Sequence, residues 1–117
     1  MGRVVILAPV PAEAIGAQLP NGHEVVAVGR EEDPVAACRG ADICVADWTS
    51  HHRVAGEVVD ALAATCRLVQ VPAAGLDSVD VEACAAAGIP VASAAGMNAI
   101  AVAEWCVWAA IGALRQL

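Results

Sequence analysis

The sequence of 117 residues contains no lysine, no tyrosine and no phenylalanine, and only 16% of its residues are charged. Six arginines stand against 13 acidic residues, so the net charge is −7. A surface of that charge repels phosphate backbones and anionic lipids, which argues against nucleic acid and membranes as partners. The apolar stretch VVILA is too short for a secretion signal, and Glu13 follows it closely. The composition, 59% hydrophobic, predicts one acidic globular domain.

Three signatures of bound groups are also absent from the sequence. No G-x-G occurs, so the glycine loop of dinucleotide sites is missing. A Walker phosphate-binding loop requires a lysine, and the sequence has none. The stretch APVPAEA lacks the Ser and Thr residues of a flavodoxin-type phosphate loop. The cysteines show no C-x-x-C spacing, which indicates reduced, buried thiols in a cytoplasmic protein rather than disulfides or a metal site. These cysteines are Cys38, Cys44, Cys66, Cys84 and Cys106. We therefore expect neither a cofactor site nor a metal site within this sequence.

What the sequence does contain is a regular alternation of two kinds of segment. Five runs rich in β-branched residues are predicted strands: RVVILA (3–8), EVVAVG (24–29), DICVA (42–46), RLVQV (67–71) and IPVAS (89–93). Their apolar residues are mostly continuous, as in strands that are covered on both faces of a parallel sheet. Alanine-rich stretches with helical spacing lie between them at 11–19, 34–39, 52–65 and 79–87. The alternation predicts an α/β fold, a flavodoxin-like, doubly wound sheet of five parallel strands.

The last segment, NAIAVAEWCVWAAIGALRQL (98–117), differs from the other predicted helices. It has no polar side chain from Trp105 to Leu114, whereas a helix on one face of a sheet needs only an apolar stripe. It is too short to span a membrane, which takes about 20 apolar residues. We expect a helix buried on two sides, against its own domain and against a second body. Without that body, Trp105, Trp108, Ile111 and Leu114 would face water, so we expect self-association through 98–117 as a two-fold dimer, which could exchange this helix.

The stretch VPAAGLDSVD (71–80) places a glycine just after a predicted strand. Open α/β sheets bind ligands at the carboxyl ends of their strands. Gly75 would let the main chain turn with unusual dihedral angles, so that successive N–H groups form a concavity suited to a carboxylate. The alternative is a plain turn at Gly75, with Asp77 or Ser78 capping the helix at 79–87. The residues alone leave both interpretations open.

Three landmarks in the second half of the sequence resemble the D-isomer-specific 2-hydroxyacid dehydrogenases. They are the stretches GLDSVD (75–80) and GIPVAS (88–93), followed by Asn98 at the start of a helix that carries VAE (102–104). The resemblance extends over essentially the whole chain and is specific over 67–104. It implies a flavodoxin-like substrate domain, also called the catalytic domain.

The resemblance also implies a division of labour between domains. The substrate domain would be 1–97, and 98–117 would be an inter-domain and dimerisation helix that normally crosses to a Rossmann domain. That domain binds NAD or NADP and, with the later catalytic arginine, acid and histidine, is absent from this chain. The family transfers a hydride between the nicotinamide and a small 2-hydroxy or 2-oxo acid. We therefore expect no catalytic or cofactor-binding residue here and no activity from the chain alone; the alternative is a free-standing flavodoxin-like module that binds carboxylates or regulates without catalysis.

Substrate-binding residues follow from the resemblance motif by motif. Ala74 and Gly75 would offer backbone N–H groups to the substrate carboxylate, and Asn98 would lie at the cleft near substrate and cofactor. For Asn98, a simple role as helix N-cap remains the alternative. Thr49 and Ser50 follow the third predicted strand, where the family's loop also touches the substrate.

The residues around Thr49 depart from the family's usual pattern. Trp48 and two adjacent histidines stand where members carry a small polar residue or arginine next to a threonine. His51 and His52 would point about 100° apart on a helix and cannot pair as zinc ligands, so we expect them at an exposed helix start. Asp47 could be the phosphate acceptor of a phosphorelay receiver, which shares this strand order. We discard that function because the chain has no lysine and no acids directly after its first strand.

Overall fold

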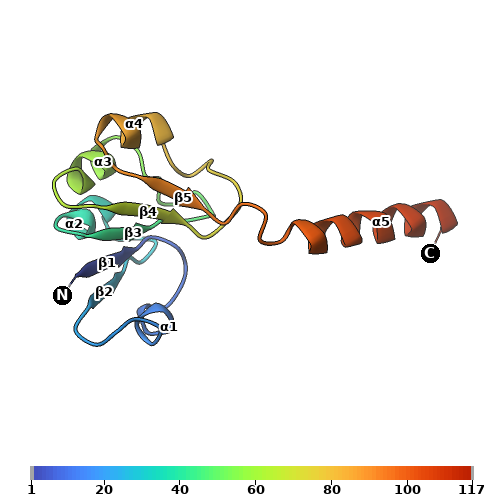
Figure 1. The fold of residues 1–117 in the computed structure, drawn as a ribbon, viewed down its shortest axis with the longest axis horizontal. Helices are drawn as coiled ribbons and strands as arrows, with labels where there is room; N and C mark the ends of the chain where they lie inside the picture. Colours follow the sequence, from blue (N-terminus) through green and yellow to red (C-terminus); the bar gives the residue numbers. More distant parts are fainter. Residues whose placement is uncertain (1, 117) are drawn as a thin grey trace.

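The computed structural model describes residues 2–116 and shows a single parallel sheet with helices on both sides and a long helix at the end (Figure 1). The elements are β1 (Arg3–Ile6), α1 (Ala12–Gly16), β2 (Glu24–Ala27), α2 (Pro34–Cys38), β3 (Ile43–Val45), α3 (Glu57–Leu62), β4 (Leu68–Val71), α4 (Val81–Ala86), β5 (Val91–Ser93) and α5 (Ala99–Arg115). The strand order is β2-β1-β3-β4-β5, and every neighbouring pair is parallel. This is the doubly wound order of flavodoxin-like domains, so the predicted fold class is confirmed.

The two faces of the sheet are covered unequally. On one face, side chains such as Val5, Cys44 and Val69 pack against buried residues of α2, α3 and α4. The opposite face is covered by α1, which places Ile15 against the side chains of β1 and β2. Over β3, β4 and β5 this second face stays only half-buried. We call this region, formed by Ile43, Val45, Leu68, Gln70 and Ala92, the open sheet face.

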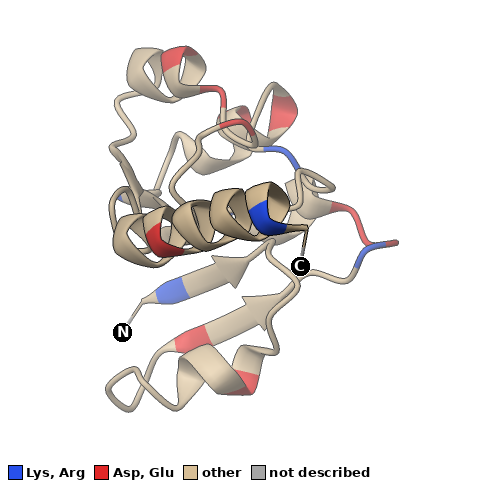
Figure 2. Ribbon diagram, turned by 90° about the vertical axis from the view of Figure 1, so that its right-hand side faces the viewer, with Lys and Arg blue, Asp and Glu red and all other residues tan. Residues whose placement is uncertain are grey.

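The helix α5 extends away from the sheet and makes the molecule 55 Å long (Figure 1). None of its 17 residues is buried, and the exposed fraction is 64% at Trp105 and 70% at Trp108. The expectation that this helix packs on its own domain is therefore wrong. The reason lies in the link at 94–98, which turns at Gly96 (φ 82°) and directs the helix outward. Figure 2 shows how few charged residues α5 carries. Within residues 2–116, no helix has the length and apolar character that crossing a membrane requires.

Four of the five cysteines are buried as predicted, and all five are free thiols. Burial raises the pKa of the Cys66 and Cys84 thiols, which keeps them protonated. Cys106 is exposed, contrary to the expectation, because α5 has no cover. In the part of the chain that the structure describes, no three His, Cys, Asp or Glu side chains gather into a group that could hold a metal ion.

Two helices begin later than their sequence pattern predicts. α3 begins at Glu57, after Gly56 with a φ of 52°, whereas the pattern placed a helix from residue 52. α4 begins at Val81, and its N-cap is Asp80, whose carboxylate accepts a hydrogen bond from the Ala83 N–H at 2.9 Å. The expectation that Asp77 or Ser78 caps this helix is therefore wrong. Asp80 directly precedes the first turn of the helix, and its carboxylate is the one that reaches the Ala83 N–H.

Removing this cap should weaken the domain measurably. We expect Asp80→Ala to lower the free energy of unfolding by about 1 kcal/mol, because the first turn of α4 loses its side-chain acceptor. The matched variant Asp77→Ala removes an exposed carboxylate that does not cap the helix, so its effect should stay within about 0.5 kcal/mol. Urea unfolding followed by circular dichroism measures both. Equal losses in the two variants would contradict the cap assignment.

Candidate functional site

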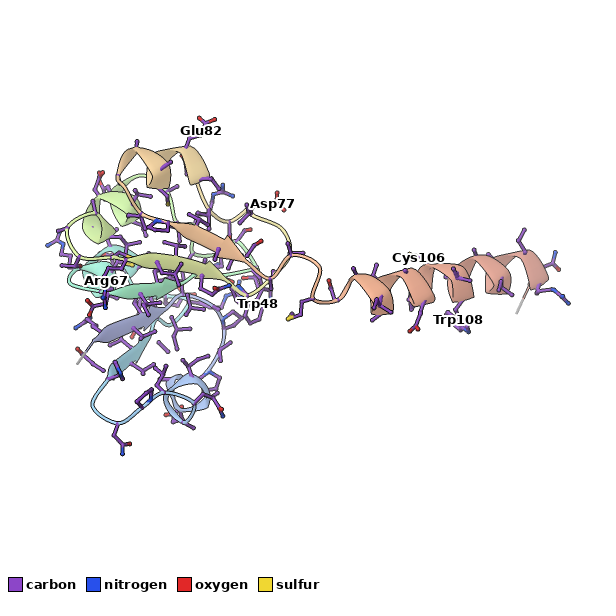
Figure 3. All side chains as sticks on the ribbon, in the orientation of Figure 1. Trp48, Arg67, Asp77, Glu82, Cys106 and Trp108 are labelled. Carbon is purple, nitrogen blue, oxygen red and sulfur yellow. The ribbon has the colours of Figure 1, made fainter. Side chains whose placement is uncertain are left out.

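A hollow of about 220 Å³ opens at the carboxyl end of the sheet. Three segments meet there, namely the loop after β3, the loop after β4 and the link before α5. The residues that line it are Trp48, Pro72, Ala73, Ala74, Ala94, Met97 and Asn98. In Figure 3, Trp48 lies at the end of the sheet from which the chain continues to α5. Because the carboxyl ends of parallel strands are where such sheets bind ligands, this hollow is the candidate site.

The loop after β4 presents free hydrogen-bond donors at this hollow. Ala74 is exposed and forms part of the wall, and Gly75 follows it. Neither backbone N–H donates a hydrogen bond to any of residues 2–116. The loop is nevertheless held in place, because the Ala73 carbonyl oxygen accepts a hydrogen bond from the Ala94 N–H at 2.9 Å. Two unpaired N–H groups on an anchored loop can bind an anion such as a carboxylate.

Gly75 does not supply the unusual turn that its position suggested. Its φ is not positive, unlike that of Gly96 in the link. A Cβ atom at position 75 would lie 3.2 Å from Oδ2 of Asp77, which is the far end of an exposed side chain and can move. The expectation about the dihedral angles is therefore wrong. The loop is distinguished by its free N–H groups and not by backbone strain.

Asn98 stands at the N-cap position of α5, but its side chain makes no capping hydrogen bond. The alternative interpretation, a plain helix cap, is thus not what this side chain does. Its amide lines the hollow and is exposed. An asparagine amide offers both a donor and an acceptor, so it can pair with an oxo or a hydroxyl group.

Thr49 and Ser50 lie outside the hollow. The Thr49 hydroxyl donates to the Asp47 carboxylate at 2.7 Å, and Ser50 occupies a turn with a φ of 59°. Trp48, three residues after the end of β3, lines the hollow instead. The structure therefore brings Ala74 and Asn98 together, places Gly75 beside them and separates the two hydroxyl residues from them. Trp48 was missed as a wall residue, because its position depends on the course of the loop after β3.

Asp47 organises the loop after β3. Its side chain is 2% exposed, and its carboxylate accepts hydrogen bonds from the N–H groups of Thr49, His51 and His52 as well as from the Thr49 hydroxyl. Burial by itself raises the pKa of this carboxyl, but the hydrogen bonds from Thr49, His52 and His51 outweigh it and lower the pKa below its usual value. The carboxylate is thus charged and fully engaged. All of its hydrogen bonds are to residues of its own loop, and it is not accessible to a ligand.

The two histidines fasten this loop to the segment after β2. His52 is buried, and its Nε2 lies 2.9 Å from the Gly29 carbonyl oxygen. His51 Nε2 lies 2.8 Å from the Arg30 carbonyl oxygen, and its Nδ1 lies 3.2 Å from Arg30 Nη2. His51 is exposed, as expected, but His52 is buried. Neither histidine begins a helix, because Asp47 holds both residues in a turn and α3 begins at Glu57.

This network fills the crevice between the ends of β1 and β3, where flavodoxin-like sheets bind their ligands. The cavity that remains there measures about 20 Å³, which is room for roughly one water molecule. The hollow beside Ala74 is larger, but it is smaller than the roughly 300–1,000 Å³ of pockets for drug-sized ligands. Its size suits a small acid and does not fit a dinucleotide.

The chain is similar to known proteins in both sequence and structure. Residues 4–110 match the family described as "D-isomer specific 2-hydroxyacid dehydrogenase, catalytic domain". No curated protein matches the chain. Among solved structures, the 3-phosphoglycerate dehydrogenase of Entamoeba histolytica with bound NAD+ superposes with a TM-score of 0.69 at 24% sequence identity. This match covers 95% of the present chain and 38% of that one.

Two further solved structures show the same fold. The NAD-dependent formate dehydrogenase of Staphylococcus aureus, in complex with NAD, gives a TM-score of 0.70 at 24% identity, over 91% of this chain and 35% of that one. The pyruvate reductase of Chlamydomonas reinhardtii gives 0.55 at 22% identity, over 79% of this chain and 28% of that one. The chain thus spans well under half the length of each. The fold, the landmark motifs and the match over 4–110 together show that this chain belongs to the D-isomer-specific 2-hydroxyacid dehydrogenase family, as its catalytic domain.

Proposed function

We propose that this chain is the substrate-binding part of an oxidoreductase that transfers a hydride between NAD(P) and a small 2-hydroxy or 2-oxo acid. The observation that carries the proposal is the hollow, where the free N–H groups of Ala74 and Gly75 lie near the unpaired amide of Asn98. The N–H groups complement a carboxylate, and the amide complements the neighbouring oxo or hydroxyl group. Membership of the family supports the same function.

The division of labour is part of this proposal. The substrate domain is 1–97, and 98–117 is the helix that leads to the domain that binds NAD or NADP. The cofactor supplies the hydride, whereas this chain binds and orients the acid. The chain alone is then inactive, because its hollow does not fit a dinucleotide. The buried free cysteines support a reducing compartment, and we place the protein in the cytoplasm.

Binding of pyruvate to the chain of 117 residues tests the proposal. We expect titration of the 15N-labelled protein to shift the amide signals of Ala74 and Gly75 and the side-chain signal of Asn98, whereas NADH shifts none of them. Asn98→Ala should weaken pyruvate binding about two- to tenfold, which is the value of one hydrogen bond, and should leave stability unchanged because the side chain has no partner here. Gln18→Ala, an exposed change distant from the hollow in sequence, is the control.

Two outcomes would contradict this function. One is the absence of any shifted signal up to high millimolar pyruvate, and the other is a set of shifted signals that lies away from the hollow. A free-standing carboxylate-binding module, the alternative, gives the same titration. The two functions are distinguished by a fusion protein in which a family member's cofactor domain follows residue 117. NADH-dependent reduction of pyruvate by the fusion is expected under the first function and not under the second.

We also propose that the chain associates with itself through 98–117 as a two-fold dimer. The support is the exposure of α5, whose contact residues would be Trp105, Trp108, Ile111 and Leu114, the last 86% exposed. A monomer rarely leaves several large apolar side chains exposed to water on one helix.

A further inference from the structure

The groups at the hollow are of two kinds, polar and apolar. The polar groups are the free N–H groups of Ala74 and Gly75 and the side-chain amide of Asn98. The apolar walls are more extensive and are formed by Trp48, Pro72, Ala73, Ala94 and Met97. The proposed function uses the polar groups and leaves the apolar walls without a role.

The geometry of a 2-oxo acid assigns these walls to its side chain. The carbon next to the carboxylate carries, besides that group, only the oxo oxygen and the side chain. When the carboxylate is bound at Ala74 and Gly75 and the oxo group at Asn98, only the side chain remains to contact the other walls. Trp48 and Met97 are 44% and 76% exposed, so a ligand can still cover both.

Charge at the hollow restricts the kind of side chain further. Among residues 2–116, no charged residue lines the hollow, and Arg30 lines the filled crevice instead, beside His51. Asp77 lies at the same end of the sheet as Trp48 (Figure 3), and its Oδ2 is 3.2 Å from where a Cβ at Gly75 would lie. A second carboxylate or a phosphate on the ligand would therefore find no cation in the walls and would be repelled by Asp77.

We propose that the hollow selects 2-hydroxy or 2-oxo acids with a single carboxylate and an apolar side chain, and that Trp48 and Met97 contact that side chain. This inference rests on the proposed function and names its substrate class. Acids that carry a second carboxylate or a phosphate lie outside this class.

The backbone of the apolar walls is held in place before a ligand binds. Trp48 lies in a turn that the Ser50 N–H closes by donating to the Asp47 carbonyl oxygen at 3.2 Å. Met97 ends a second turn, which its own N–H closes by donating to the Ala94 carbonyl oxygen at 3.1 Å. Walls on an anchored backbone lose less conformational entropy on binding, so more of the apolar burial contributes to affinity.

The volume of the hollow indicates how long the side chain is. At about 30 Å³ of liquid volume per water molecule, about 220 Å³ is room for roughly seven waters. Pyruvate, whose side chain is a methyl group, leaves part of this space filled with water against apolar walls. Each further methylene that replaces such water and is fully buried strengthens binding about fourfold. A side chain of a few carbons therefore fits the hollow better than a methyl group does.

A matched pair of acids, titrated into the 15N-labelled chain beside pyruvate, tests the proposal. Oxaloacetate and 4-methyl-2-oxopentanoate have a similar shape, but an isopropyl group in the latter stands where oxaloacetate has its second carboxylate. We expect 4-methyl-2-oxopentanoate to bind about tenfold more tightly than pyruvate and to shift the indole N–H signal of Trp48. Oxaloacetate is expected to bind more weakly than pyruvate, because its second carboxylate has no cation in the walls.

Variants of Trp48 show whether this wall selects the side chain. Trp48→Ala should reduce the preference for 4-methyl-2-oxopentanoate over pyruvate by about threefold, because apolar surface is lost from the wall. Trp48→Arg should reverse the preference within the matched pair, since a guanidinium then faces the second carboxylate. Trp105→Ala makes the same truncation on exposed α5 and should leave all three affinities unchanged. Circular dichroism confirms that each variant is folded.

The outcomes separate this inference from the proposed function. If pyruvate binds at the hollow and oxaloacetate binds at least as tightly as 4-methyl-2-oxopentanoate, the substrate class is wrong and the proposed function stands. If none of the three acids shifts a signal at the hollow, both are wrong. If the preference for the apolar acid survives in Trp48→Ala and is lost in Trp105→Ala, that acid binds at α5, which also overturns the substrate class.

Discussion

Replacing Asp47 by alanine is expected to lower the free energy of unfolding by about 3 kcal/mol. The carboxylate is buried and satisfies three backbone N–H groups and one hydroxyl at once. Removing it leaves the buried His52 N–H and the part-buried N–H groups of Thr49 and His51 without an acceptor, which costs roughly 1–3 kcal/mol for each group that water cannot reach. Urea unfolding at neutral pH measures the loss. A loss below about 0.5 kcal/mol, typical of surface changes, would contradict the role given to Asp47.

The same carboxylate makes the stability depend on pH. Its pKa is lowered in the folded protein, since the hydrogen bonds from Thr49, His52 and His51 outweigh the effect of burial. The stabilisation that it provides is therefore complete above the ordinary carboxyl pKa and is lost as the pH falls through the folded value. We expect the difference in unfolding free energy between the wild type and Asp47→Asn to shrink below about pH 4. A difference that stays constant from pH 7 to pH 3 would argue against this assignment.

Ala74→Glu is expected to weaken the binding of a 2-oxo acid by at least about fivefold. Position 74 forms part of the wall of the hollow and is exposed, so a carboxylate there faces the carboxylate of the ligand. Two like charges about 4 Å apart repel by about 1 kcal/mol in water and by about 4 kcal/mol at a protein surface. The corresponding loss in affinity runs from about fivefold to several hundredfold.

The matched variant Ala74→Gln separates charge from size. It adds the same number of heavy atoms without the charge, so it should weaken pyruvate binding less than Ala74→Glu does. Both should leave the unfolding free energy within about 0.5 kcal/mol of the wild type, because the side chain is exposed. Titration of the labelled protein with pyruvate gives both affinities. Equal affinities for the two variants would mean that no carboxylate binds beside Ala74.

The strands were predictable, because each lies in a short, mostly apolar stretch rich in β-branched residues and needs no partner to be recognised. The residues at which the helices begin were less predictable. Asp77, Ser78 and Asp80 are all acceptable caps by type, and only the position of the Ala83 N–H shows that Asp80 is used. Likewise, glycine at position 75 suggested a strained turn, but the backbone there needs none. A local pattern indicates which residue types suit a cap or a turn. It does not determine which of several neighbouring residues of a suitable type takes that role.

The site was predictable where the family's motifs carry it. Ala74 directly precedes the landmark GLDSVD, Asn98 is itself a landmark, and the structure brings both residues to one hollow. Trp48 could not be placed there in advance, because the direction of the loop after β3 depends on Asp47 and on the contact of His51 with the segment after β2. Thr49 was expected at the site, but its hydroxyl donates to the Asp47 carboxylate instead, because the same loop turns it that way.

The sequence by itself determined the fold class, the family and the apolar character of α5, because each follows from the order and type of residues along one segment. The tertiary structure alone decided which loops meet at the hollow, which crevice is filled and where α5 points. These depend on hydrogen bonds between segments far apart in the chain, such as His52 with Gly29 and Ala94 with Ala73. A pattern read along the chain contains no information on such distances until the strands are placed side by side.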